Sequence, residues 1–254
     1  MKIPENPAGL LVVGDCQALV CPMGPNLGFP DQLARLLKSP SHTAVGYLKL
    51  SQRAKVRDLV RRLRPEILIL QMGHFELTGK PPQVTTTPFA SPFETRPGRF
   101  AWHVRTVGKI VTNLFFKRSK VDWQALDSEV DLFLRNVSQC ASETGTRVIL
   151  LSPLPCADPI SRSLRQQAGY CFQSRTAHYP QVEYLDVLQD PLLTRTGFQP
   201  FFDGTHLSAE GHFRLAQLLS RKVLKTSPAE VKPAPQRALP YRFLSASVRQ
   251  RSLT

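Results

Sequence analysis

Short apolar runs and amphipathic segments alternate along most of the chain. Apolar runs typical of buried strands occupy residues 11–13, 43–50, 66–72, 147–151 and 182–187. Between them, apolar residues recur at helical spacing over residues 32–37, 52–63, 122–142 and 159–177, and again after Ser208, a candidate N-cap of the final helix. Strands separated by helices predict a parallel sheet with right-handed crossovers. We therefore expect an α/β protein, a three-layer α/β/α sandwich around a central parallel sheet of about five strands.

Two stretches depart from this alternation. Residues 77–120 hold no sustained period, are rich in proline, threonine and aromatic residues, and are longer than an ordinary connection. We expect them to form an insertion that acts as a lid. Residues 226–254 are rich in proline and alanine with scattered arginines, which predicts a flexible basic tail. The predicted organisation is one α/β domain over residues 1–225 with a lid at about 77–120, followed by the tail.

The composition is that of an ordinary globular protein. At 254 residues, 42% hydrophobic and 20% charged, the chain can bury one large core. The first residues lack the apolar region of a signal peptide, and no segment is long enough to span a membrane, so we expect a cytoplasmic protein. Five irregularly spaced cysteines suggest neither a disulfide framework nor a zinc site. No metal or organic cofactor is implied.

Chemically suggestive residues follow the predicted strand ends. Cys16 follows the first strand, at the sheet edge where ligands bind in open α/β folds. A cysteine there is either a small apolar residue or a nucleophile. Asp203 and His206 lie three residues apart before the last helix. If the fold brings them together, His206 can deprotonate Cys16, Asp203 can orient the imidazole, and backbone amides near Cys16 and Gly46 can bind an oxyanion.

In order and spacing these motifs resemble those of the SGNH (GDSL-like) hydrolase family. Residues 14–16 (Gly-Asp-Cys) are similar to the family's GDS block, Gly46 to its oxyanion glycine, residues 73–76 (Gly-His-Phe-Glu) to its GxND block, and residues 203–206 to its DxxH block. The resemblance covers about residues 10–225. It implies a flavodoxin-like α/β/α fold and acyl transfer. The implied catalytic residues are Cys16, Asp203 and His206, and the implied oxyanion and pocket residues are Asp15, Gly46, His74, Phe75 and Glu76.

Two positions depart from the family pattern. Cysteine replaces the nucleophilic serine, and Phe75, which cannot donate a hydrogen bond, replaces the asparagine of the oxyanion hole. Losing such a donor can cost on the order of 3 kcal/mol of transition-state stabilisation. Glu76 stands for the family's aspartate, a milder change, and His74 either substitutes as a donor or simply lines the loop. Cys21 is a further concern, because a disulfide with Cys16 would silence the nucleophile.

The thiol suggests a specific chemistry. It loses its proton far more easily than an alcohol and would form a thioester acyl-enzyme, which reacts with amines and thiols as well as water. We therefore expect an ester or thioester hydrolase, or an acyltransferase, with a Cys-His-Asp triad. The alternative is a catalytically degenerate SGNH-fold binding module that uses the same pocket.

The net charge of +14 suggests an anionic partner. Basic residues crowd the helix over 52–63, and residues 96–120 hold seven Arg or Lys and no acid. An acidic carrier protein bearing an acyl thioester would suit this charge, with Arg61, Arg62 and Arg105 as candidate contacts; a solvated basic surface is the alternative. No nucleic-acid-binding motif is present, so nucleic acid is the least favoured partner.

Overall fold

The computed structural model describes residues 9–19, 26–39, 41–78, 107, 121–157, 159–194, 201 and 206–225. A five-stranded sheet lies at its centre. The strands are β1 (Leu10–Gly14), β2 (His42–Val45), β3 (Ile67–Gln71), β4 (Arg147–Leu151) and β5 (Val182–Leu185). They lie in the order β2-β1-β3-β4-β5, and all neighbours are parallel. The predicted parallel sheet is confirmed.

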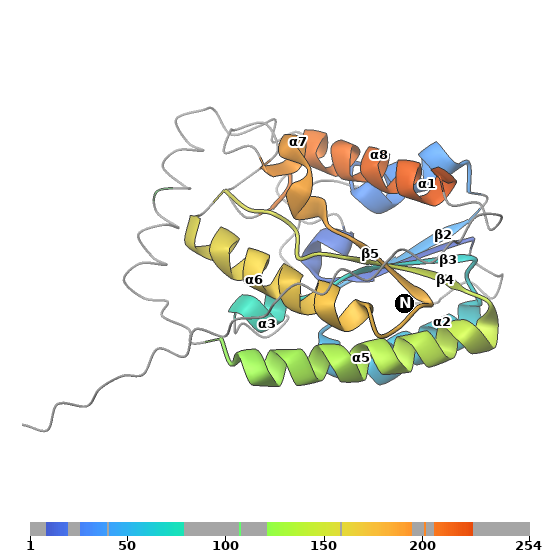
Figure 1. Cartoon of the computed structure of the whole chain (residues 1–254). Helices are drawn as coiled ribbons and strands as arrows, with labels where there is room; N and C mark the ends of the chain where they lie inside the picture. Colours follow the sequence, from blue (N-terminus) through green and yellow to red (C-terminus); the bar gives the residue numbers. More distant parts are fainter. Residues whose placement is uncertain are drawn as a thin grey trace, which may run out of the picture.

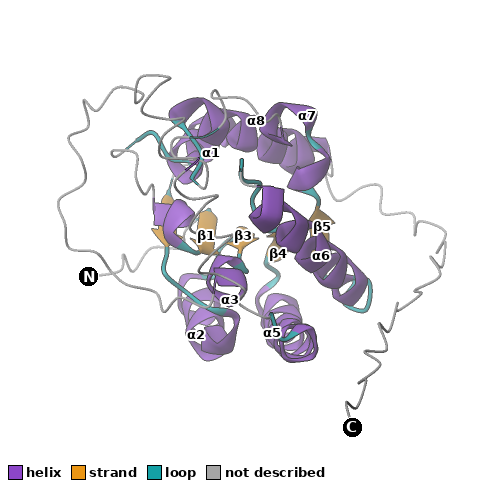
Figure 2. Cartoon of the chain, turned by 90° about the vertical axis from the view of Figure 1, so that its left-hand side faces the viewer, coloured by secondary structure: helices purple, strands orange, loops and turns teal. Residues whose placement is uncertain are grey.

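Helices cover both faces of this sheet (Figures 1 and 2). On one face lie α1 (Phe29–Leu37) and α8 (Ala209–Lys225), and on the other lie α2 (Arg53–Leu63) and α5 (Trp123–Thr144), with α6 (Pro159–Thr176) beside α5. Successive side chains of a strand point to opposite faces, so β1 contributes to two cores. Its odd-numbered residues pack with α2 and α5, and its even-numbered residues pack with α1 and α8. The three-layer arrangement is also confirmed.

Local chemistry explains several helix ends. The helix predicted over residues 32–37 begins three residues earlier, at Phe29, because Pro30 had been interpreted as part of a loop. Proline is tolerated in the first turn of a helix, where the backbone N–H that it lacks would have no partner within the helix. Asp122 caps α5 by accepting the backbone N–H of Ala125 at 3.0 Å, and Gly145 ends the helix in the left-handed region (φ 71°). Ser208 caps α8 as predicted, since its Oγ accepts the backbone N–H of Gly211 at 3.1 Å.

The largest errors in the predicted elements lie at strand ends. The strand predicted over residues 43–50 ends at Val45, because Tyr47 takes a left-handed conformation (φ 60°) and Leu50 begins a 3-10 turn, Leu50–Gln52. The strand predicted over 182–187 ends at Leu185, and a 3-10 turn, Val187–Gln189, follows it. A short helix that the sequence did not predict, α3 (His74–Thr78), starts three residues after β3. Another short helix, α7 (Pro191–Thr194), precedes the return to the sheet edge.

The predicted lid lies outside the described residues, apart from Leu77, Thr78 and Val107, and the predicted tail lies wholly outside them. Among the helices that the structure describes, none is both long and apolar enough to cross a membrane.

Candidate active site

The site forms at the point where the strand order changes direction. From β1 the chain passes to β2 on one side, whereas β3, β4 and β5 follow on the other side. In this strand order, ligands bind in the crevice between the carboxyl ends of the first and third strands. Gly14, the last residue of β1, lies opposite Gln71, the last residue of β3. The segments that follow these two residues therefore leave the sheet side by side.

Cys16 begins a 3-10 turn, Cys16–Leu19, directly after β1. Gly14 allows the end of β1 to lie close against the end of β3, because a Cβ at this position would lie 2.4 Å from the backbone oxygen of Gln71. Asp15 braces the turn. Its Oδ1 accepts the backbone N–H of Gln17 at 2.9 Å, and its Oδ2 accepts the side-chain amide of Gln71 at 2.6 Å. Burial raises the pKa of Asp15, and these two hydrogen bonds oppose the rise.

The fold brings Cys16 and His206 together. Cys16 Sγ lies 3.6 Å from His206 Nε2, although the residues are 190 positions apart in the sequence. Only 7% of Cys16 is exposed, so a substrate has to enter the crevice to reach the sulfur. This contact is what proton transfer from a thiol to an imidazole requires.

Gln17 holds the two ends of the site in register, and the sequence analysis missed it. Its buried side-chain oxygen accepts the backbone N–H of Leu207 at 3.0 Å. The residue after the candidate nucleophile is thus tied to the residue after the candidate base. The available signal was a long polar side chain beside Cys16, directly after a strand predicted to be buried. Asp203, the predicted third member of the triad, lies outside the described residues and stays a prediction.

Gly46 lies against the turn that carries Cys16. A Cβ on Gly46 would approach the backbone oxygen of Asp15 to 2.7 Å and Leu19 Cγ to 2.5 Å. Only glycine allows the backbone after β2 to pass this close to the turn after β1. The predicted oxyanion glycine is therefore a neighbour of the candidate nucleophile.

His74 also lies in the site, at the start of α3. Its ring centroid is 6.5 Å from that of His206, and its Nδ1 is 3.1 Å from Nη2 of Arg165. Arg165 comes from α6 and is only 3% exposed; it also donates to the backbone oxygens of Leu154 and Pro155. Little in the amino-acid pattern distinguishes this residue from the two other arginines of α6, Arg162 and Arg175.

Phe75 packs against an aromatic ring, whereas Glu76 forms a hydrogen bond with the backbone. Phe75 is buried and stacks on Tyr47 with ring centroids 6.4 Å apart. Glu76 braces the backbone, because its Oε1 accepts the N–H of Leu50 at 2.7 Å. Burial raises the pKa of Glu76, and the hydrogen bond from Leu50 opposes the rise. Within the described residues, no group of three or more His, Cys, Asp or Glu side chains is placed to hold a metal ion.

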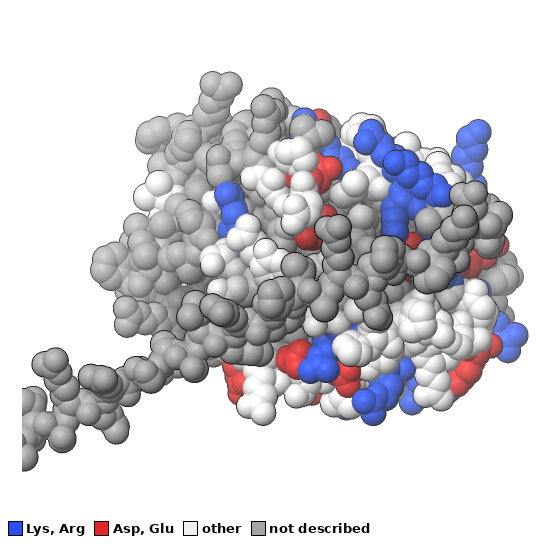
Figure 3. Space-filling view, viewed as in Figure 1, with Lys and Arg blue, Asp and Glu red and all other residues white. Residues whose placement is uncertain are grey.

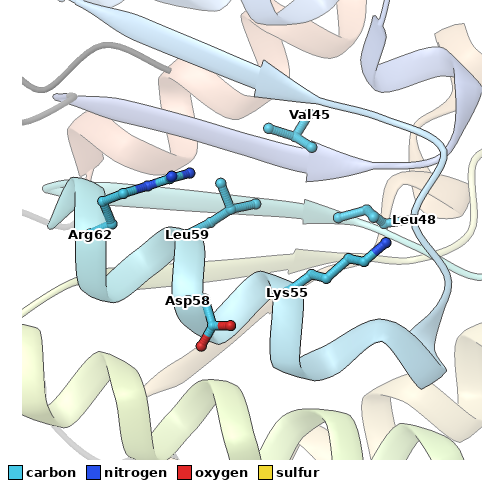
Figure 4. Close-up of a pocket in the computed structure, with 6 residues that line it drawn as sticks. All are labelled: Val45, Leu48, Lys55, Asp58, Leu59 and Arg62. Carbon is cyan, nitrogen blue, oxygen red and sulfur yellow. The ribbon is translucent and has the colours of Figure 1, made fainter. Parts of the chain in front are cut away.

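Arg61 and Arg62, two of the arginines predicted to contact a partner, lie in different surroundings on α2. Arg61 pairs with Glu143 of α5 at 2.8 Å, and Figure 3 shows acidic and basic side chains interspersed along the lower edge of the molecule. Arg62 lines a hollow of about 370 Å³ between β2 and α2 (Figure 4). The other residues that line this hollow are Val45, Leu48, Lys55, Asp58 and Leu59. Arg105 and Cys21 lie outside the described residues.

Neither a protein-family model nor a curated protein sequence matches this chain. Solved structures do match. A lipolytic protein of the G-D-S-L family from Desulfitobacterium hafniense is 12% identical, with a TM-score of 0.51 over 86% of this chain and 99% of that one. LAE5, an alpha/beta hydrolase enzyme from the metagenome of Lake Arreo, is 13% identical, with a TM-score of 0.55 over 89% and 95%. The family 3 carbohydrate esterase of Clostridium thermocellum is 12% identical, with a TM-score of 0.51 over 85% and 96%. The chain therefore has the fold of the SGNH (GDSL-like) hydrolases.

Proposed function

We propose that this protein is an acyl-transfer enzyme with Cys16 as nucleophile and His206 as base. The reaction passes through a thioester acyl-enzyme, and the enzyme is an ester or thioester hydrolase or an acyltransferase. The observation that carries the proposal is the 3.6 Å contact between Cys16 Sγ and His206 Nε2 at the switch point of the sheet. The likeness of the fold to that of solved lipolytic proteins and esterases supports it.

The reaction has two halves. In the first, His206 Nε2 takes the proton of Cys16, the thiolate attacks the acyl carbonyl carbon, and the leaving alcohol or thiol departs with the proton from His206. In the second, water or another acceptor gives a proton to His206 and attacks the thioester. The C–S bond then breaks, and the thiolate of Cys16 recovers the proton. Asp203 would orient the imidazole throughout.

An oxyanion forms in both halves and needs hydrogen-bond donors. We assign this role to backbone amides near Cys16 and Gly46, whose chain segments lie against each other. Phe75 adds no donor. In our proposal His74 is the side-chain donor to the oxyanion. Its Nδ1 accepts a hydrogen bond from Arg165, so its own proton is on Nε2.

The substrate we favour is an ester or thioester with an apolar acyl group. We assign its apolar contact to Phe75, a buried ring that stacks on Tyr47 and directly follows His74 in the chain. A thioester on an acidic carrier protein remains our choice for the partner, with Arg62 and Arg105 as contacts. Arg61 is the weakest of the three candidates, because Glu143 already neutralises it.

Intact and peptide-level mass spectrometry tests the proposal. The protein is mixed with a panel of acyl esters and acyl-pantetheine thioesters, beside the variants Cys16→Ala, His206→Ala and Cys171→Ala. Cys171 is a matched control, because burial and the neighbouring Asp127 raise the pKa of its thiol to about 12. We expect an acyl mass on the Cys16 peptide, weaker in His206→Ala and unchanged in Cys171→Ala.

One outcome would reject this function. If no donor acylates Cys16, and an electrophilic thiol reagent modifies Cys16 no faster than Cys171, the chain is better described as a binding module on the same fold.

A further inference from the structure

We propose that Arg165 is a positioning residue for this reaction: it fixes His74 as a neutral imidazole with its proton on Nε2. The catalytic consequence rests on the proposed function. The hydrogen bond itself does not, so the two can be tested separately.

The geometry determines the tautomer. A guanidinium is always charged and only donates hydrogen bonds. Because Arg165 Nη2 lies 3.1 Å from His74 Nδ1, that nitrogen has to present its lone pair. A neutral imidazole carries one N–H, which is then on Nε2. In a doubly protonated His74, the N–H on Nδ1 would point at the N–H of Arg165 Nη2, and the positive imidazolium would lie beside the positive guanidinium.

Arg165 can impose this state because it is itself held rigidly. It is 3% exposed, and its Nη1 donates to the backbone oxygens of Leu154 and Pro155 in the loop after β4. The planar guanidinium thus has one edge fixed to the loop and another directed at His74. Its charge also favours the ionised form of Asp15, against the burial that raises the pKa of that carboxyl group.

A fixed tautomer serves the reaction in two ways. It keeps the proton of His74 on Nε2, the ring nitrogen that does not face Arg165. This N–H is the donor that we assign to the acyl oxygen. It also keeps His74 uncharged beside His206, whose ring centroid is 6.5 Å away and which becomes positive when it takes the proton of Cys16. Arg165 acts through His74 and does not contact the substrate.

A purely structural role for Arg165 would be to fasten the loop after β4, and α6 offers a control for that role. Arg162, one turn earlier, donates from Nε and Nη2 to the backbone oxygen of Cys156 at 3.2 Å and from Nη2 to that of Ala157 at 3.4 Å. Within the described residues, its hydrogen bonds go to this loop and not to His74. A variant of Arg162 therefore weakens the loop anchor and leaves His74 unchanged.

The experiment compares the full-length wild type with Arg165→Met, Arg165→Lys and Arg162→Met. Nitrogen-15 NMR of labelled histidine separates the two neutral tautomers and the charged ring, and His74→Gln assigns the signals. We expect the Nε2–H form of His74 in the wild type and in Arg162→Met, and a mixture in Arg165→Met. Acyl transfer should lose about tenfold or more in kcat in Arg165→Met with KM little changed, because the lost donor acts in the transition state.

The outcomes are separable. An unchanged His74 tautomer in Arg165→Met, or an equal loss of kcat in Arg162→Met, would overturn the inference. Arg165→Lys keeps a charged donor and should restore part of both readouts; it carries the test if Arg165→Met does not fold. If the wild type transfers no acyl group, the proposed function fails and the catalytic part of the inference fails with it, whereas the tautomer remains measurable.

Discussion

Cys16 and His206 are the residues on which the proposed chemistry depends. Cys16 lies in the turn after β1 and His206 lies just before α8, and the turn of Cys16 is braced by the buried carboxyl group of Asp15. In the proposed mechanism the thiol attacks as a thiolate once His206 has taken its proton, and an alcohol gives up its proton far less readily.

We predict that Cys16→Ser slows acylation by more than about tenfold, because the hydroxyl keeps its proton far more firmly than the thiol. The measurement is the rate of acyl-enzyme formation with the best donor of the panel. An equal or faster rate in the serine variant would show that the thiol is not what the site requires.

His212 gives a pH-dependent prediction at the same scale. It is fully buried, its Nδ1 accepts the backbone N–H of Phe29 at 3.3 Å, and burial lowers its pKa to about 3. An unfolded histidine has a pKa of about 6.5. As the pH falls from about 6.5 towards about 3, the unfolded state takes up a proton that the folded state refuses, so the free energy of unfolding decreases.

Urea unfolding at a series of pH values checks this sign. The variant His212→Asn keeps an acceptor near Phe29 but loses the titrating ring, so its free energy of unfolding should change less over that range. Equal pH slopes in the wild type and the variant would contradict the assignment.

At the scale of elements, the site depends on how the turn after β1 meets the segment before α8. Gln17 connects them through its hydrogen bond from Leu207, and Glu76 connects α3 to the turn after β2 in the same manner. Each side chain accepts a hydrogen bond from a backbone N–H outside the sheet; the bond of Gln17 is buried and that of Glu76 is partly buried. Removing such an acceptor leaves a buried donor unsatisfied.

We expect Gln17→Met to lower the free energy of unfolding by about 1–3 kcal/mol, the usual cost of a buried unpaired donor. Acylation of Cys16 should slow as well, because His206 is then held less firmly. Chemical unfolding and the acylation rate are the two measurements, with Gln139→Met on the exposed face of α5 as the control. A variant that loses stability but acylates at the wild-type rate would separate Gln17 from the site.

For the molecule as a whole, charge is the distinctive property. The net charge is +14, yet several arginines of the described residues are matched by acids, as in the pairs Arg61–Glu143, Arg53–Glu129 and Arg175–Asp127. Exposed pairs of this kind contribute little to stability.

If an acidic carrier protein presents the acyl group, association should weaken with salt. We predict that raising the salt from about 50 to about 500 mM increases KM for a carrier-bound thioester far more than for the matching acyl-pantetheine. Arg62→Glu and Arg105→Glu should reduce that difference. Equal salt dependence for both substrates would remove the carrier protein from the proposal.

The sequence alone was enough to predict the layers and the sheet edge. β4 has the predicted bounds, 147–151, because its apolar run is covered on both faces and lies between the polar residues Thr146 and Ser152. The contact between Cys16 and His206 followed from parallel strands that end at one edge and from a resemblance in motif order. Such features repeat along the chain or follow strand ends, so they can be predicted from the order of residues alone.

The hydrogen bonds that hold the site were decided only by the tertiary structure. Leu50 and Glu76 are 26 residues apart, His74 and Arg165 are 91 apart, and Gln17 and Leu207 are 190 apart. Each joins one polar side chain to one distant group, with no period and no local propensity to mark it. Tyr47 shows the same limit, since its left-handed backbone ends β2 early although the sequence favoured a longer strand. Packing selects these partners, because a buried donor or acceptor has to find its match wherever the fold has placed it.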